Sequence, residues 1–144
     1  MSKKEIPVLR IYFMLRAKRG SAVESSLRAA KLDLDDVAST ISHRSFEGKG
    51  SSYHPPFGAL EIGFELFTYD LPEAERRVAR LFEGLDRNAE IIRKLTKKGA
   101  LASFVMNVNS MNAEQRPVCF LSREQVELLA QFGATVSVDG YLMF

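Results

Sequence analysis

The sequence has one cysteine, two histidines and almost no net charge, and each scarcity narrows the classes of protein that fit. Cys119 has no partner for a disulfide within the chain, and a lone cysteine favours a reducing compartment. Twenty Lys and Arg residues against 18 Asp and Glu leave a net charge of +2, too balanced to predict nucleic-acid binding.

Long apolar runs are also missing. No stretch approaches the roughly 18 apolar residues of a membrane-spanning helix. The basic N-terminus is followed by an apolar run that Arg10 and Arg16 interrupt, unlike the core of a signal peptide. We therefore expect a cytoplasmic protein that does not associate with membranes.

The few residues suited to catalysis or metal binding are scattered. A metal site usually needs three or four ligands, whereas His43, His54 and Cys119 lie far apart in the sequence. A nucleophile–base pair of Cys119 with His54 would rest on residue type alone. Cys119 lies in the apolar run PVCFL, where a buried, inert thiol is expected. We expect no catalytic residues, no metal and no cofactor.

What the sequence does have is alternation of apolar and polar residues. With 144 residues, of which 46% are hydrophobic, it has the size and composition of one domain spanning residues 1–144. Alternation predicts strands over 8–17, 59–69, 101–110 and 134–143. The expected inward residues are Leu9, Ile11, Phe13, Leu15, Leu60, Ile62, Phe64, Leu66, Phe104, Met106, Val108, Val136, Val138 and Leu142. Because each strand has one polar face, we expect an α+β fold: a mixed or antiparallel sheet of about 4–6 strands with helices on one face.

Helical spacing predicts helices over 33–41, 72–85, 88–98 and 122–132, while 21–31 could be a helix or a loop. The last helix carries a capping box, Ser122 with Gln125, and Gly133 predicts its end. Its expected inner stripe is Val126, Leu129 and Ala130. We place the following strand between two neighbours, because an exposed apolar edge strand promotes aggregation.

The two halves of the chain share a pattern of strand, helix and strand. The strands at 8–17 and 101–110 are each followed by a capped helix, at 33–41 and 122–132, and then by a further strand. This pattern is consistent with a diverged duplication of a β-α-β unit. Convergence on a common supersecondary motif explains it equally well.

The segment 46–58, FEGKGSSYHPPFG, has the most unusual composition. Its glycines would allow backbone amides to approach an anion, but the spacing of a Walker phosphate loop is absent. A hairpin connection with Tyr53 and Phe57 packed over the end of the sheet is the simpler interpretation. Recognition is a third one, because loops on rigid scaffolds commonly bind partners.

The polar face of the sheet offers a candidate docking surface. Arg10, Tyr12 and Arg16 share one face of the first strand, and Glu61 and Glu65 share one face of the second. Cross-strand Arg–Glu pairs on a solvated face would explain these residues without any function. Arg and Tyr are also typical anchors of protein interfaces. The two glutamates lie about 13 Å apart on one strand, too far for a glycosidase carboxylate pair.

The stretch FLSREQVELLAQFGATVSVDGY, residues 120–141, resembles the ending of a bacterial family of unknown function, DUF4279. That ending has a Leu-Ser-x-Glu start, a Leu-Ala near the helix end, a glycine, and a strand closing on Asp-x-Tyr. The element LDLDDV at 32–37 is similar to an early element of the family, and the likeness extends over the chain. The sequence departs from the family in lacking a tryptophan in its middle strand and in a longer segment at 18–31.

The resemblance implies no enzymatic activity and no catalytic residues. Small one-domain proteins of this kind resemble immunity proteins encoded beside bacterial toxins. We therefore expect a non-enzymatic binding protein that occludes a cognate toxin domain, and the alternative is a small-anion or ligand-binding protein, or an enzyme, using 46–58. The expected partner-binding residues are Arg10, Tyr12, Arg16, Tyr53, His54, Phe57, Glu61 and Glu65.

Overall fold

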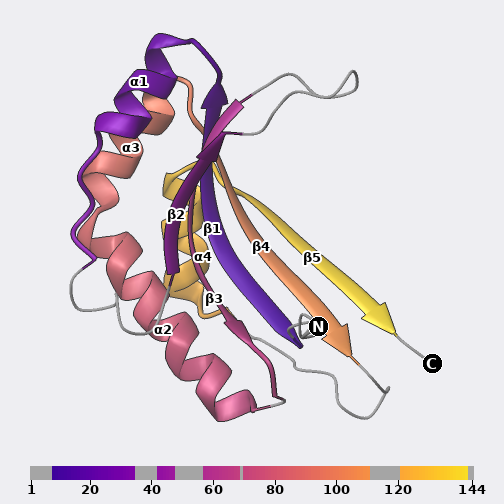
Figure 1. The fold of residues 1–144 in the computed structure, drawn as a ribbon. Helices are drawn as coiled ribbons and strands as arrows, with labels where there is room; N and C mark the ends of the chain where they lie inside the picture. The colour runs from indigo at the N-terminus through magenta and orange to yellow at the C-terminus, as the bar shows by residue number, and fades with distance from the viewer. Residues whose placement is uncertain (1–7, 35–41, 48–56, 69, 111–120, 143–144) are drawn as a thin grey trace.

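The computed structural model describes residues 8–34, 42–47, 57–68, 70–110 and 121–142, and of 42–47, 57, 109–110 and 139–142 it describes the backbone alone. These residues form five strands and four helices (Figure 1). In chain order they are β1 (Leu9–Lys18), α1 (Ala22–Ala29), β2 (Ser42–Glu47), β3 (Phe57–Leu66), α2 (Leu71–Arg87), α3 (Ala89–Lys97), β4 (Leu101–Ser110), α4 (Arg123–Gln131) and β5 (Thr135–Leu142).

The strands form one mixed sheet in the order β2-β3-β1-β4-β5. β1 lies antiparallel to both β3 and β4, β2 lies antiparallel to β3, and β5 lies parallel to β4. With α2 and α3 as one helical connection, β1 to β4 follow the split β-α-β arrangement, and α4 with β5 extends it. The expected α+β fold with a mixed sheet is confirmed.

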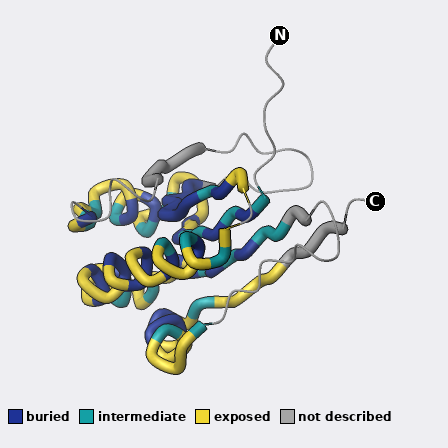
Figure 2. The backbone as a smooth tube through the Cα atoms, turned by 90° about the horizontal axis from the view of Figure 1, so that it is seen from below, coloured by how far each residue is buried: buried dark blue, intermediate teal, exposed yellow. Residues whose placement is uncertain are grey.

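The helices pack on one face of the sheet, because β1 and β3 alternate as expected. Every second residue of β1 from Leu9 to Ala17 is buried, and its partners in β3 are buried with it. Phe13 meets Phe132 at the end of α4 with ring centroids 5.7 Å apart, and Phe82 of α2 meets Phe104 of β4 at 5.3 Å. Each fully buried side chain of this size contributes roughly 1.5–3 kcal/mol. Figure 2 shows the buried core between the helices and the strands.

Local capping explains where the helices begin and end. The expected helices 72–85, 88–98 and 122–132 correspond to α2, α3 and α4, and the segment 21–31 holds α1, whose N-cap is Ser21. Ser122 and Gln125 form both hydrogen bonds of the predicted capping box. Gly133 has φ +63°, the left-handed conformation that ends a helix at low cost. Most of the helix expected at 33–41 lies outside the described residues.

The two β-α-β units differ in their pairing. The strands joined by α4, β4 and β5, are hydrogen-bonded neighbours. The strands joined by α1, β1 and β2, run in the same direction but have β3 between them. A duplication therefore has to account for a strand inserted into one unit, and it stays a hypothesis.

Three expectations about the C-terminal elements are wrong. β5 lies at one end of the strand order and pairs with β4 alone among the described strands, not between two neighbours. Val136 and Val138 are 53% and 63% exposed, because the helical layer does not extend over β5 (Figure 2). On α4, Val126 and Ala130 are exposed, and the inner stripe consists of Leu128, Leu129 and Phe132.

The junction of α2 and α3 is held by one buried polar side chain. Asn88 is 3% exposed. Its amide nitrogen donates to the carbonyl oxygens of Gly84 (2.7 Å) and Asp33 (2.9 Å), and its Oδ1 accepts from the Asp33 backbone N–H at 2.7 Å. These bonds fix the segment after α1 to the helix junction, although the two lie 55 residues apart in sequence.

We expect Asn88→Ala to lower the free energy of unfolding by about 2 kcal/mol, because the backbone groups of Asp33 and Gly84 would lose buried partners. The urea midpoint of the purified protein measures this loss. Glu90→Ala, at an exposed position of α3, is the control and should shift stability by less than about 0.5 kcal/mol. Equal midpoints for the two variants would contradict a clamping role for Asn88.

Candidate functional site

The candidate site lies on the face of the sheet opposite the helices. Arg10, Tyr12 and Arg16 project there because they alternate with the buried residues of β1. Glu61 and Glu65 lie on the same face of β3, where Glu65 pairs with Arg10 in the backbone register. From the sequence, the arginines could be placed on one face of β1 and the glutamates on one face of β3. The pairing of the two strands shows that these faces form one surface.

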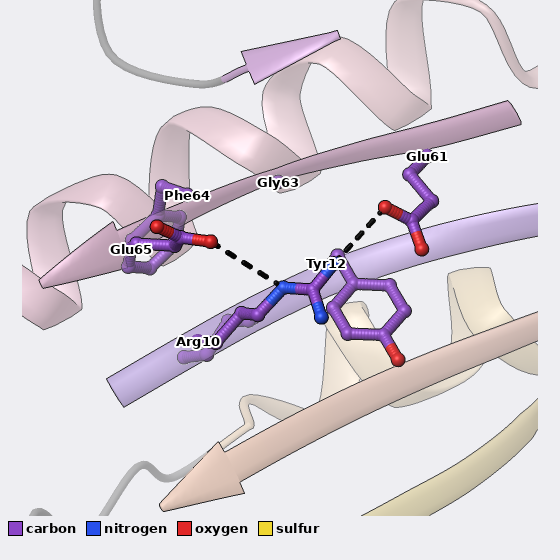
Figure 3. Close-up of a pocket in the computed structure, with 7 residues that line it drawn as sticks. Arg10, Tyr12, Glu61, Gly63, Phe64 and Glu65 are labelled. Atoms are coloured by element: carbon purple, nitrogen blue, oxygen red, sulfur yellow. Dashed lines mark hydrogen bonds and ion pairs between the residues drawn. The ribbon is translucent and has the colours of Figure 1, made fainter. Parts of the chain in front are cut away.

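Arg10 joins the two glutamates (Figure 3). Its Nη2 lies 3.1 Å from Glu61 Oε2, and its Nε lies 3.6 Å from Glu65 Oε1. The guanidinium also stacks on Tyr12, with Cζ 4.5 Å from the ring centroid. One cation thus bridges two carboxylates and orders an aromatic ring, which limits the rotamers of all four side chains. We call Arg10, Tyr12, Glu61 and Glu65 the Arg10 cluster.

The two ion pairs differ in their exposure to water. The Glu61 side chain is 10% exposed and that of Glu65 is 38% exposed, while Arg10 is 28% exposed. Water screens the Glu65 pair more strongly, and its distance is longer. The buried carboxylate of Glu61 therefore needs charge compensation more than that of Glu65 does, and Arg10 contributes to it.

Gly63 makes room for the cluster. It pairs with Tyr12 across the strands, and a Cβ at this position would collide with the Ile11 carbonyl oxygen and with Tyr12 Cβ. β1 and β3 can approach this closely only with glycine at residue 63. A bulkier residue there would separate the strands that carry Arg10 and the glutamates.

The hollow beside the cluster is small. It is lined by Arg10, Ile11, Tyr12, Glu61, Gly63, Phe64 and Glu65, with a volume of about 10 Å³. That volume holds about one water molecule, whereas pockets for small ligands span roughly 300–1,000 Å³. The geometry at this point suits contact with a surface rather than enclosure of a metabolite.

The remaining predicted site residues are separate from the cluster or undescribed. Arg16 is exposed and lies six residues from Arg10 on β1, about 20 Å away. Tyr53 and His54 lie outside the described residues, and only the backbone of Phe57 is described, paired with Lys18. The segment 48–56 joins Glu47 of β2 to Phe57 of β3, and Glu47 pairs with Gly58 at the Arg16 end of β1. The expected surface shared by this segment with Arg10 stays a prediction.

One buried carboxylate is not among the residues predicted from the sequence. Glu24 on α1 is 8% exposed, and its Oε1 accepts from the Gly20 N–H at 3.2 Å and lies 3.7 Å from Arg28 Nε. Its Oε2 has no hydrogen-bond partner among the described residues and fills the space left by the missing side chain of Gly58. The burial of Glu24 could not be predicted, because residues 21–31 fitted a helix and a loop equally well.

The described ranges hold neither a candidate metal centre nor a membrane-spanning helix. In the ranges that the structure describes, His, Cys, Asp and Glu side chains do not gather in threes as a metal site requires. Across the same ranges, every helix is too short or too polar to cross a membrane. Cys119 lies outside these ranges, and so does the nucleophile–base pair considered for it.

The chain matches the model of a known family. The family model described as a domain of unknown function, DUF4279, matches residues 66–143 of the 144, which is more than half of the chain. The match covers α2 to β5 and begins after Arg10, Tyr12, Glu61 and Glu65. Neither a curated protein nor a solved structure matches the chain.

The unequal burial of the two ion pairs can be tested with double-mutant cycles. We expect a coupling free energy of at least ~1 kcal/mol between Arg10 and Glu61, and about 0.3 kcal/mol between Arg10 and Glu65, because the second pair is better solvated. Urea unfolding of the Arg10→Ala, Glu61→Ala and Glu65→Ala single and double variants gives both values. Equal couplings, or a larger one for Glu65, would show that burial does not set their strength.

Proposed function

Because the chain belongs to the DUF4279 family, for which no activity is described, we propose its function from the site: a non-enzymatic binding protein that neutralises a cognate bacterial toxin domain by covering it. The proposal extends to a cytoplasmic location and to action without a cofactor. The observation that carries it is the Arg10 cluster on the sheet face opposite the four described helices.

The cluster has the properties of a preorganised anchor. Tyr12 is half-buried, and the Arg10 guanidinium holds its ring, so little conformational entropy remains to be lost on binding. Tyr and Arg are enriched among the residues that dominate interface energies. The charge of Arg10 is largely offset by Glu61 and Glu65, so we assign the main anchoring role to the Tyr12 ring.

Arg16 supplies a second contact on the same face. It is exposed at the other end of β1, beside Leu101 of β4, which is 58% exposed. A cation next to an apolar side chain suits a partner surface that combines acidic and apolar groups. The two ends of β1 would then contact one partner, along the length of the strand on the open face.

We expect Tyr12→Ala or Arg16→Ala to weaken binding of the toxin domain encoded beside this gene by at least ~2 kcal/mol at one of the two positions. Isothermal titration calorimetry measures the affinity. Glu75→Ala and Glu90→Ala, on exposed helical positions, are the controls and should leave it nearly unchanged. Losses confined to the helical variants would place the partner on the helical layer. Loss of anion binding in variants of 46–58, with no toxin partner, would favour the ligand-binding alternative.

A second test addresses enzymatic activity. We expect the double variant Cys119→Ala/His54→Ala to keep full protection of cells that express the toxin, because a docking surface needs neither nucleophile nor base. Growth assays and thermal melts of the same variant provide the measurement. Loss of protection at an unchanged melting temperature would favour an enzyme.

A further inference from the structure

β5 is exposed to an unusual degree for a strand that belongs to a sheet. Each residue from Thr135 to Val138 is exposed, although their side chains alternate between the two faces. Thr135 Oγ1 bonds Ser103 Oγ at 3.0 Å on the open face. Val136 and Val138 share a face with Phe104 and Met106, their partners in β4, which are buried. The helical layer thus ends at β4, and the valines lie beyond it.

α4 presents further apolar surface toward the same side. Gln131 of α4 accepts a hydrogen bond from Arg93 of α3 at 2.7 Å, which identifies the flank of α4 that faces α3. Val126 lies about 140° around the helix axis from Gln131, on the flank that faces away from α3. Val126 is 51% exposed. We call Val126, Val136 and Val138 the β5 patch.

The free edge of β5 lacks the features that usually block edge-to-edge pairing. Thr135–Leu142, TVSVDGYL, contains no lysine, arginine or proline, and its only charge is that of Asp139. Edge strands of monomeric proteins commonly carry such residues, because unpaired N–H and C=O groups act as a template for another strand. Within the described part of the chain, the outer edge of β5 has no strand beside it. The N–H and C=O groups of this edge match those of another strand.

We propose that β5 pairs antiparallel with β5 of a second copy of this chain, across a two-fold axis that passes through the sheet at Ser137. In this register Val136 lies opposite Val138 of the second copy, and Thr135 lies opposite Asp139, so that no like charges meet. An axis perpendicular to the sheet keeps both helical layers on the same face. The two α4 helices then flank the four valines, and the β5 patches of both copies form one apolar strip.

The second copy fits this edge better than a foreign strand does. A partner chosen by charge would need a complementary charged strand, but β5 offers one carboxylate in eight residues. A two-fold pairing places Asp139 opposite a neutral residue, Thr135, rather than opposite a second carboxylate, and it matches valine to valine on the other face. The edge is thus complementary to itself, as an isologous interface requires.

The oligomeric state of the full chain tests the proposal. We expect light scattering after size exclusion, at roughly 50 μM protein, to give twice the chain mass of 16.2 kDa. Val136→Lys/Val138→Lys should give a folded monomer that still unfolds cooperatively, because both side chains are exposed in the single chain. Its melting temperature should fall only by the contribution that dimerisation makes to the wild type. Leu101→Lys is the matched control: Leu101 is 58% exposed on β4 but lies away from β5, and this variant should stay dimeric. If the lysine pair unfolds the chain, Val136→Ser/Val138→Ser replaces it.

A cysteine crosslink tests the register. In a Cys119→Ser background, Ser137→Cys should form an intermolecular disulfide under mild oxidation, because directly opposite Cα atoms lie about 4.5–5.5 Å apart, within the range for disulfides. Thr135→Cys should not, because its two copies would lie about 13 Å apart. A monomeric wild type overturns the proposal. So does a dimer that survives both the lysine and the serine pairs, or one that crosslinks at Thr135 instead. Pairing with a strand of the toxin domain by a monomeric chain would overturn it in favour of a foreign partner.

Discussion

The central strand β1 has one buried apolar face and one polar face, and the rest of the structure depends on this division. β1 pairs along its length with β3 and β4, so its alternation imposes the same two faces on both neighbours. On the apolar face Ile11, Phe13 and Leu15 are 0% exposed, and burial of these side chains requires helices packed on this face. The other face is left for polar residues. The Arg10 cluster can form there because the register sets Arg10 opposite Glu65, and the Arg10 guanidinium also reaches Glu61 on the same face of β3.

The features that could be predicted from the sequence are those that depend on neighbouring residues in the chain, such as strand alternation and helix caps. Period-two alternation identified the inward residues of β1, β3 and β4, and caps such as Ser122 with Gln125 located the helices. Alternation does not show how far a helical layer extends. Val136 and Val138 were therefore assigned to the core, although they lie on the correct face beyond the edge of that layer. On α4 the spacing allowed two adjacent stripes, and packing of Phe132 on Phe13 selects the one that contains Leu128.

The candidate site was only partly predictable for a related reason. Sequence placed Arg10, Glu61 and Glu65 on polar faces, but contact between them depends on pairing across 51 residues of chain. The role of Gly63 depends on the same register, because its missing side chain matters only where Tyr12 is its partner. Non-local pairing also explains why Asn88, an ordinary interhelical residue in the sequence, bonds the backbone of Asp33. Each of these contacts joins segments whose proximity no local pattern encodes.

The two proposed surfaces are geometrically compatible and would reinforce each other. A two-fold axis at β5 perpendicular to the sheet leaves both open faces on one side of a continuous ten-stranded sheet, twice the five strands of one chain. The two β1 strands would then be separated by β4 and β5 of each copy, five strand spacings or about 24 Å. Two preordered Tyr12 anchors at that separation could contact two sites of a dimeric toxin at once. Linked binding of this kind raises avidity without any new contact, so a dimer could retain its toxin even if each Arg10 cluster bound only moderately.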